Sequence, residues 1–185
     1  MAVAARLFTR QGFHKTSVEE IARAAKVGKA TIYLFFRDKA GLLGEVYWRK
    51  AMELKDKMVR EITPGEGTVA RLLKMLGIYW DFCSSDPIFS EFLSHREEVQ
   101  ELEFIPEFDA IEEEAVNLIG KVLNEGIERG EIRPMPTDLA AHLLFRVGFY
   151  LSHHGRDLFK KFSPEAILDL FDSVLVCGVA KVGNS

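Results

Sequence analysis

Residues 16–43 read TSVEEIARAAKVGKATIYLFFRDKAGLL and carry the strongest local structural signals of the chain. Ser17 and Glu20 have the spacing of a capping box, in which each side chain accepts a hydrogen bond from the other residue's backbone amide. A helix is therefore predicted to begin directly after Ser17. The apolar positions that follow have the i, i+3, i+4, i+7 spacing of one buried helical face: Val18, Ile21, Ala22 and Ala25.

A second short helix is predicted only a few residues later. Gly28 can serve as its N-cap, and Val27 and Ile32 have the spacing of a hydrophobic staple across its first turn. Ile32 and Phe36 would hold this helix against the core. The outer face is then left to small, cationic or hydrogen-bonding side chains: Lys29, Ala30, Thr31 and Tyr33. Such a face fits the major groove of DNA, so the pair is interpreted as a helix-turn-helix.

A third helix is predicted to begin after Asp38, which can act as its N-cap. Lys39 then lies at a helix N-terminus, where the helix macrodipole disfavours a cation. An external anion would explain this placement, because the free amides of a helix start and one lysine together bind phosphate well. Lys39 is therefore predicted to contact the DNA backbone.

The net charge of −4 is divided unevenly along the 185 residues. Residues 1–60 hold thirteen lysines and arginines against six acidic residues, a net charge of +7. The remaining residues hold eleven basic and twenty-two acidic side chains, a net charge of −11. A basic N-terminal part on an acidic body is typical of a nucleic-acid binder, although clustering of charges on solvated helices is the alternative explanation.

Four motifs in about the first quarter of the chain resemble the DNA-binding domain of the TetR family of bacterial transcriptional regulators. In order they are ARLFTRQGF at 5–13, TSV at 16–18 with Ile21 and Ala22, VGKATIY at 27–33, and Phe36 with Lys39, Leu42 and Leu43. The predicted DNA-binding residues are Ser17, Lys29, Ala30, Thr31, Tyr33 and Lys39. Of these, Ser17, Tyr33 and Lys39 are expected to hold phosphates.

The sequence also departs from the pattern of this family. Lys26 stands where the family usually has a turn glycine, so either the backbone avoids positive φ there or Lys26 carries strain. Gly28 replaces the usual Ser or Thr cap, and Phe35 replaces a Tyr or His that usually touches the DNA backbone. The family usually has more residues ahead of Ala2, so either a shortened first helix or a native start farther upstream fits the sequence.

Helical patterns continue through the rest of the chain and predict an all-α protein. We expect an N-terminal helix-turn-helix domain at 1–43 and a C-terminal helical domain for ligand binding and dimerisation at 44–185, linked by a helix from about 39 to 60. Further helices are predicted at 69–83, from 87, at 108–130, at 137–154 and at 164–181.

The last two predicted helices are apolar nearly all round. A helix of this kind must be buried on every side, which in a small domain indicates contact with a second subunit. The TetR resemblance implies the same arrangement, a homodimer whose last two helices form a four-helix bundle. Such a dimer would read two half-sites about 34–36 Å apart on a near-palindromic operator.

Aromatic residues are frequent in the expected body of the protein. They indicate either an ordinary aromatic core or an apolar pocket for an aromatic, lipid-like or drug-like effector. The candidate pocket residues are Tyr79, Trp80, Phe89, Phe92, Phe108, His142 and Phe145. No metal site and no cofactor are expected, because the histidines are not accompanied by HExxH or paired ExxH motifs.

Several other classes of protein lack support in the sequence. There is no catalytic triad pattern, phosphate loop or dinucleotide fingerprint, so no enzyme is predicted. No apolar run reaches the ~20 residues of a membrane span and no signal peptide is visible, so a cytoplasmic protein is expected. Cys83 and Cys177 form no CxxC pair, in agreement with a reducing compartment.

The predicted function is a ligand-responsive, sequence-specific DNA-binding regulator, a repressor that a small apolar or aromatic molecule releases from its operator. Its partners would be double-stranded DNA, the effector and a second copy of the chain. One alternative is an adaptor of the same fold that recruits a protein without an inducer. A helical-bundle enzyme or carrier is the other alternative, and bound metal or cofactor would favour it.

Overall fold

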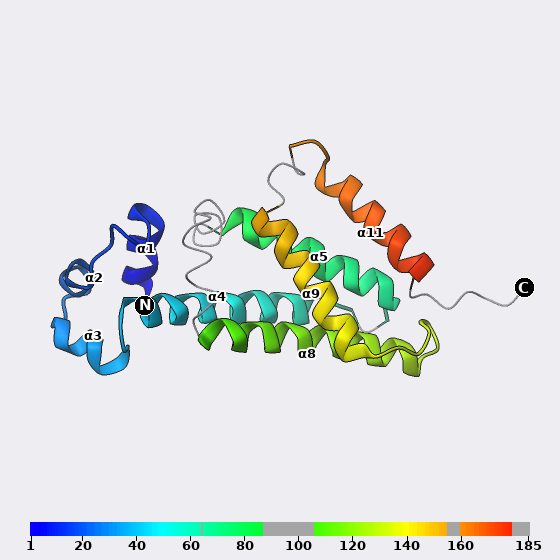
Figure 1. Ribbon diagram of the computed structural model, residues 1–185, viewed down its shortest axis with the longest axis horizontal. Coiled ribbons are helices and arrows are strands. Elements are labelled where there is room, and N and C mark those ends of the chain that lie inside the picture. The colour runs from blue at the N-terminus through cyan, green and yellow to red at the C-terminus, as the bar shows by residue number, and fades with distance from the viewer. Residues whose placement is uncertain (64, 87–105, 155–159, 179–185) are drawn as a thin grey trace, which may run out of the picture. The chain divides into compact units, whose positions relative to one another are not determined.

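A computed structural model describes residues 1–63, 65–86, 106–154 and 160–178 (Figure 1). Its regular elements in these ranges are α-helices, which confirms the predicted all-α class. They are α1 (Ala2–Gln11), α2 (Val18–Ala25), α3 (Lys29–Phe35), α4 (Lys39–Glu61), α5 (Thr68–Ser85), α8 (Pro106–Glu128), α9 (Thr137–His154) and α11 (Pro164–Gly178). The helix predicted from residue 87 lies outside the described residues. Within the described ranges, no helix is both long and apolar enough to cross a membrane.

The chain divides into two compact units. The first contains residues 1–54 and 82–111, and the second contains residues 55–81 and 112–185. The division therefore falls inside α4, α5 and α8, each of which contributes residues to both units. The predicted functional division after residue 43 concerns DNA binding and ligand binding, and it stays a prediction.

In the first unit, α2 begins directly after Ser17, as the local sequence predicts. The capping box is present, since the Ser17 hydroxyl accepts from the Glu20 amide at 3.2 Å and the Glu20 carboxylate accepts from the Ser17 amide at 3.0 Å. The buried Thr16 hydroxyl donates to the Gly12 carbonyl at 2.8 Å and fixes the turn between the two helices. Ala4 and Phe8 of α1 and three residues of α2 are buried.

The turn after α2 contains a left-handed residue. Lys26 has φ 57° and ψ 40°, so of the two alternatives for this position the structure shows positive φ. This conformation costs a non-glycine residue roughly 1–2 kcal/mol. Gly28 then acts as the N-cap of α3, and Asp38 caps α4 by accepting from the Gly41 amide at 2.8 Å.

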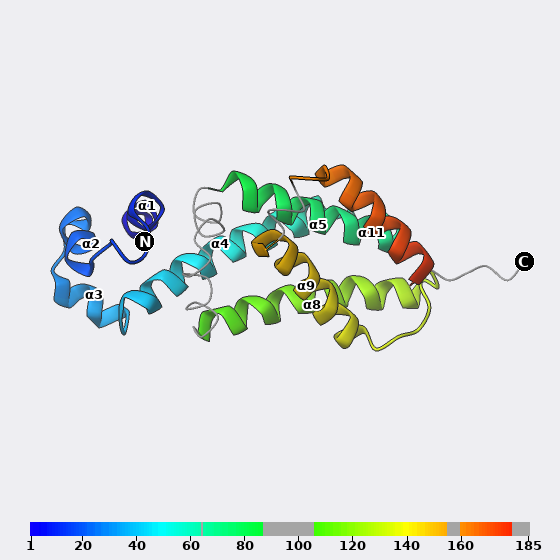
Figure 2. The same ribbon diagram turned by 45° about the horizontal axis from the view of Figure 1, so that its top comes forward.

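The core of the second unit is formed by α5, α8 and α9 together with the end of α4. Its buried members are Ile62, Leu72, Met75, Val116, Val122, Leu123, Ile132 and Ala141. Small residues bring α9 close to its neighbours: Ala141 Cβ is 3.9 Å from a Cβ built on Gly120, and Leu76 is 3.3 Å from one built on Gly148. Accordingly, α9 lies against α5 and α8 in both views (Figure 1, Figure 2).

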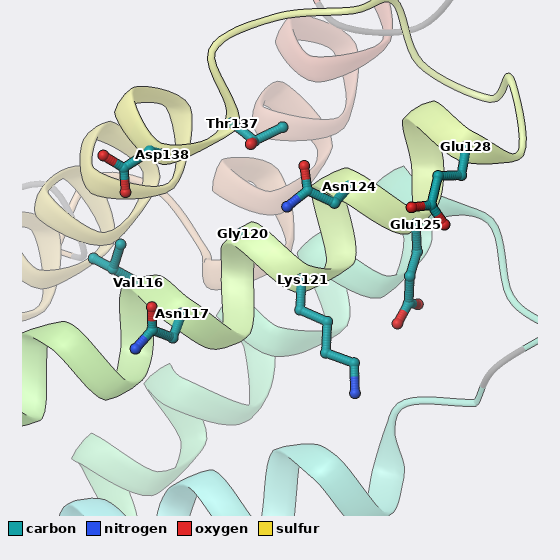
Figure 3. Close-up of a pocket in the computed structure, with 9 residues that line it drawn as sticks. All are labelled: Val116, Asn117, Gly120, Lys121, Asn124, Glu125, Glu128, Thr137 and Asp138. Carbon is teal, nitrogen blue, oxygen red and sulfur yellow. The ribbon is translucent and has the colours of Figure 1, made fainter.

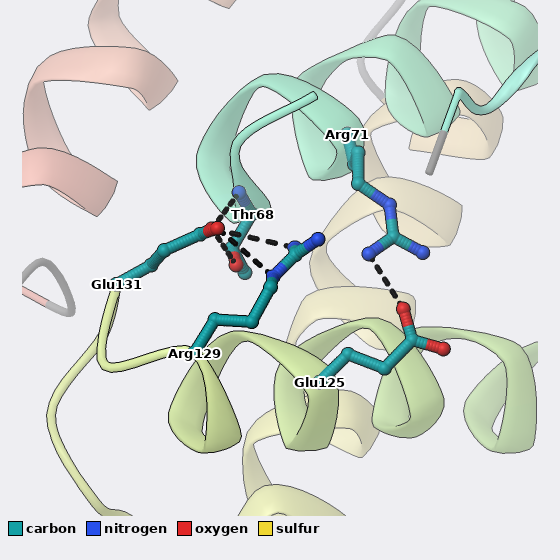
Figure 4. A network of polar contacts seen from close by, with 5 residues as sticks. All are labelled: Thr68, Arg71, Glu125, Arg129 and Glu131. Carbon is teal, nitrogen blue, oxygen red and sulfur yellow. Dashed lines mark hydrogen bonds and ion pairs between the residues drawn. The ribbon is translucent and has the colours of Figure 1, made fainter. Parts of the chain in front are cut away.

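A polar network joins the start of α5 to the end of α8 and the loop that follows it (Figure 4). One carboxylate oxygen of Glu131 accepts from the amide and the hydroxyl of Thr68, at 2.7 and 2.6 Å. These hydrogen bonds lower the pKa of Glu131, whose negative charge also suits a helix N-terminus. Arg71 donates to Glu125 at 2.7 Å beside them.

Candidate nucleic-acid interface

Helix α3 presents most of its surface to solvent. Ile32 is its buried residue, whereas the four residues predicted to enter or line a DNA groove are exposed: Lys29, Ala30, Thr31 and Tyr33. The structure therefore places these four residues on one short helix with the exposure that groove contact requires. Their contact with DNA stays a prediction.

Lys29 is paired with Glu19 of α2. Its ammonium group donates to the Glu19 carboxylate and lies 5.7 Å from the centre of the Tyr33 ring. The hydrogen bond between Lys29 and Glu19 raises the pKa of the lysine and lowers that of the glutamate. Because both side chains are about half exposed, the pair is within reach of a ligand that approaches α3.

Lys39 has a structural contact that the sequence did not reveal. Its ammonium group donates to the Phe13 carbonyl at 2.8 Å and lies 4.1 Å from the centre of the Phe13 ring. This contact fastens the start of α4 to the turn after α1. The phosphate contact predicted for Lys39 is untested by this geometry, and a change of Lys39 would also disturb the packing of the domain.

Ser17 and Tyr33, the other predicted phosphate ligands, have different surroundings. The Ser17 hydroxyl is half-buried and engaged with Glu20, to which it also donates at 3.1 Å. Tyr33 is exposed beside Lys29. Their phosphate contacts stay predictions. Of the two residues, Tyr33 is the one whose side chain is exposed.

Leu34 and Phe35 are exposed apolar residues of α3 that the predicted set of DNA-binding residues omits. Their exposed fractions are 78% and 72%. The helical spacing could have indicated Leu34, because it follows Ala30 and Thr31 by four and three residues and so shares their face.

Of the predicted effector residues in the described ranges, Tyr79 and Trp80 lie on α5, Phe108 on α8, and His142 and Phe145 on α9. Trp80 is buried with its ring 6.5 Å from that of Phe171, whereas Tyr79 is half-buried. Phe145 stacks on Phe149 at 5.8 Å, and the exposed His142 lies 3.4 Å from the Glu112 carboxylate. Phe89, Phe92 and the side chain of Phe108 lie outside the described part of the chain.

The described residues form at least two surface pockets. One, of about 480 Å³, lies along α8 and the start of α9 and has a polar lining that includes Asn117, Lys121 and Asp138 (Figure 3). The other, of about 640 Å³, lies in the first unit between α1 and α4 and includes Arg6 and Arg10. Neither contains a predicted effector residue. Among the described residues there is no group of three or more His, Cys, Asp or Glu that could hold a metal ion.

The exposed apolar side chains of α9 form a second candidate surface. Leu139, Leu143, Val147 and Tyr150 are exposed at spacings of four, four and three residues, so they form a stripe along one side of the helix. Leu170 and Val174 are likewise exposed on α11. The sequence led us to expect that one face of each of these helices meets a second subunit, and these faces are exposed in the single chain. Their burial in a dimer stays a prediction.

Comparison with known proteins identifies the N-terminal helices and the fold. Residues 1–46 match the family described as bacterial regulatory proteins, tetR family. An uncharacterized HTH-type transcriptional regulator, YhgD of Bacillus subtilis, is 22% identical over 97% of this chain and 94% of its own length. A fatty acid metabolism regulator protein of the same organism is 24% identical over 77% of this chain and 74% of its own length.

Solved structures share the fold over nearly the whole chain. The crystal structure of the regulator FadR from Bacillus subtilis, in complex with stearoyl-CoA, has a TM-score of 0.75 and 22% identity over 96% of each chain. The resemblance predicted from the four N-terminal motifs is thereby confirmed.

Proposed function

We propose that this chain, a member of the TetR family of bacterial transcriptional regulators, is a homodimeric repressor that an acyl-coenzyme A thioester releases from a near-palindromic operator. The observation that carries the proposal is the combination of a TetR-family helix-turn-helix at 1–46 with full-length similarity to a regulator that binds stearoyl-CoA. Residues 1–43 would bind DNA and residues 44–185 would bind the effector and dimerise. Such a repressor works beside the bacterial chromosome, so a cytoplasmic location is part of the proposal.

The exposed stripe of α9 supports dimerisation. Contiguous apolar surface of this kind is unfavourable in water and usually marks a contact site. The four side chains of α9 together with Leu170 and Val174 of α11 fall on the two helices that the sequence pattern assigns to the dimer. A two-fold dimer through these helices would bury them against the same residues of a second copy.

The class of effector is inferred from relatives. One relative is named a fatty acid metabolism regulator protein, and the structure of FadR was solved in complex with stearoyl-CoA. Both descriptions refer to lipid metabolism. A long acyl chain is also the small apolar molecule that the aromatic residues of the body led us to expect. The proposed contacts for this chain are Tyr79, Trp80, Phe89, Phe92, Phe108, His142 and Phe145.

Release from DNA would follow from a shift between two conformations of the dimer. A ligand changes such an equilibrium only when it binds one conformation more tightly than the other. We propose that the acyl-CoA favours a conformation in which α4 has moved and the two α3 helices no longer match half-sites about 34–36 Å apart. Couplings of this kind typically change affinity by about 5- to 150-fold.

The experiment begins with selection of double-stranded DNA from a random library by the full-length chain. The affinity for the selected operator is then measured with stearoyl-CoA, with coenzyme A and with stearate. We expect a near-palindromic operator and at least about a tenfold loss of affinity with stearoyl-CoA alone. Selection of no sequence would contradict the DNA-binding function. An operator complex that is insensitive to acyl-CoA would contradict the effector class and favour the adaptor alternative.

A further inference from the structure

Leu34 and Phe35 are the most exposed of the large apolar side chains in the described residues. Their exposed fractions of 78% and 72% exceed the 64% of Leu170, the next in order. Exposed apolar area is unfavourable in water, and here it lies on a helix of seven residues with one buried residue, Ile32. The position of Leu34 on α3 indicates which kind of partner would cover its side chain.

Leu34 lies opposite the buried side of α3. Successive residues of a helix are separated by about 100°, so Leu34 is about 200° from Ile32. Ala30 and Thr31 precede Leu34 by four and three residues and share its face. The exposed surface of α3 therefore carries a ridge of three apolar groups: the Ala30 methyl, the Thr31 methyl and the Leu34 side chain.

Basic side chains flank this ridge. Lys29 lies at the start of α3 and is paired with Glu19. Arg37, whose side chain is 86% exposed, follows the end of α3 and is paired with Asp38 at 2.9 Å. Residues 1–60 together carry a net charge of +7. The partner that fits is a polyanion that also offers small apolar groups, and in the major groove of DNA the apolar group on the base edges is the C5 methyl of thymine.

We propose that the ridge of Ala30, Thr31 and Leu34 recognises thymine methyl groups in each operator half-site, with Leu34 as the main contact. The inference rests on the proposed function, in which α3 enters the major groove. It adds a specificity-determining residue to the predicted set and predicts the chemistry of the bases that the operator requires.

The test replaces thymine by deoxyuridine, one position at a time, in the operator selected by the full-length chain. This change removes the C5 methyl and leaves base pairing intact. One buried methyl corresponds to about a fourfold change in affinity, so the same replacement in both half-sites should weaken binding about fifteenfold. We expect this loss at one or two thymine positions of each half-site, and no loss at thymines outside the half-sites.

The variant Leu34→Ala connects the effect to the protein. It should bind the thymine operator more weakly than the unchanged chain and should no longer distinguish thymine from deoxyuridine at the sensitive positions. Its thermal unfolding should be unchanged, because Leu34 is largely exposed. Val59→Ala is the matched control, since it shortens another exposed apolar side chain on α4 and should retain the full discrimination.

The outcomes separate this inference from the proposed function. A chain that selects no DNA sequence overturns both. A chain that selects an operator but binds thymine and deoxyuridine equally at every position overturns the inference alone. Full discrimination retained by Leu34→Ala also overturns the assignment to Leu34, whatever the operator sequence.

Discussion

Helices α3 and α9 both expose large apolar side chains, but the two exposed surfaces differ in length and in surroundings. On α3 they are the neighbours Leu34 and Phe35 on a helix of seven residues, between Lys29 and Arg37. On α9 four of them follow one another over three turns, and α11 adds Leu170 and Val174. The cations near both surfaces are paired within the chain: Lys29 with Glu19 and Arg37 with Asp38 near α3, and Arg146 of α9 with Glu112.

This difference shows that exposed apolar area alone does not identify a partner. A short ridge flanked by cations offers too little area for a stable protein interface, but it suits a polyanion with small methyl groups. A long stripe on two helices suits a copy of itself, because a two-fold axis brings the same residues together. Changing the α3 ridge should therefore leave dimerisation intact, whereas loss of the dimer should weaken operator binding, because the two half-sites are then no longer bound together.

The largest effect is expected from Leu143→Glu, which places a charge in the middle of the α9 stripe. Leu143 is 58% exposed, so the chain should still fold, but the dimer interface would have to bury an unpaired carboxylate. We expect a monomer in sedimentation equilibrium. Operator affinity should fall by about 10²- to 10⁴-fold, because each half-site is then bound alone.

Leu34→Ala is the matched variant on the other surface. It should remain dimeric in the same sedimentation experiment and keep the thermal stability of the unchanged chain. A monomeric Leu34→Ala, or a Leu143→Glu chain that remains dimeric, would remove the distinction between the two surfaces.

A smaller effect is expected from Gly126→Ala, which alters the interior of the second unit and neither surface. A Cβ at Gly126 would lie 2.2 Å from the Thr68 hydroxyl oxygen and 2.9 Å from the Thr68 Cβ, so α5 and α8 would have to separate. Overpacking of this kind costs about 1–3 kcal/mol in the free energy of unfolding. Urea denaturation should show the loss, and the preference for thymine should persist.

Gly67→Ala is the control for this prediction. A Cβ at Gly67 meets no atom within 4 Å, although the residue directly precedes Thr68. Its stability should be close to that of the unchanged chain. Equal stability of the two variants would show that the approach of Gly126 to Thr68 is not the tight contact that the structure describes.

The smallest effect is expected from Lys26→Gly, which acts only in the turn before α3. Glycine adopts the left-handed conformation of this residue without a steric penalty, at the cost of greater freedom in the unfolded chain. We expect the free energy of unfolding to rise by about 0.5–1 kcal/mol, as measured by thermal unfolding. Lys26→Ala removes the same charge without relieving the backbone, so a similar gain there would assign the effect to charge instead.

Local signals made much of the fold predictable. The capping box of Ser17 and Glu20 and the Asp38 cap involve residues three positions apart, and all of these hydrogen bonds are present. The helices predicted at 137–154 and 164–181 correspond to α9 and α11, whose described bounds are Thr137–His154 and Pro164–Gly178. Periodicity and capping were sufficient for these elements because each depends on neighbouring residues.

Contacts between distant residues could not be predicted in the same way. Lys39 and Phe13 are 26 positions apart, and Thr68 and Glu131 are 63 apart. Tyr79 and Trp80 are adjacent in sequence, but their burial differs and Trp80 meets the ring of Phe171. Composition therefore indicated an aromatic body, whereas only packing shows which rings meet. The effector contacts proposed for these residues stay predictions.

The pairing of Lys29 with Glu19 has a consequence for the ionic-strength dependence of operator binding. Each phosphate that a basic side chain neutralises releases about 0.9 counterion from the DNA, and the salt dependence of affinity counts these ions. If Lys29 exchanges Glu19 for a phosphate, the carboxylate left behind attracts a cation from solution. The net number of ions released when this lysine binds a phosphate is then smaller than the number released by a lysine that has no carboxylate partner. Counting cations around α3 would therefore overestimate how steeply affinity falls with salt.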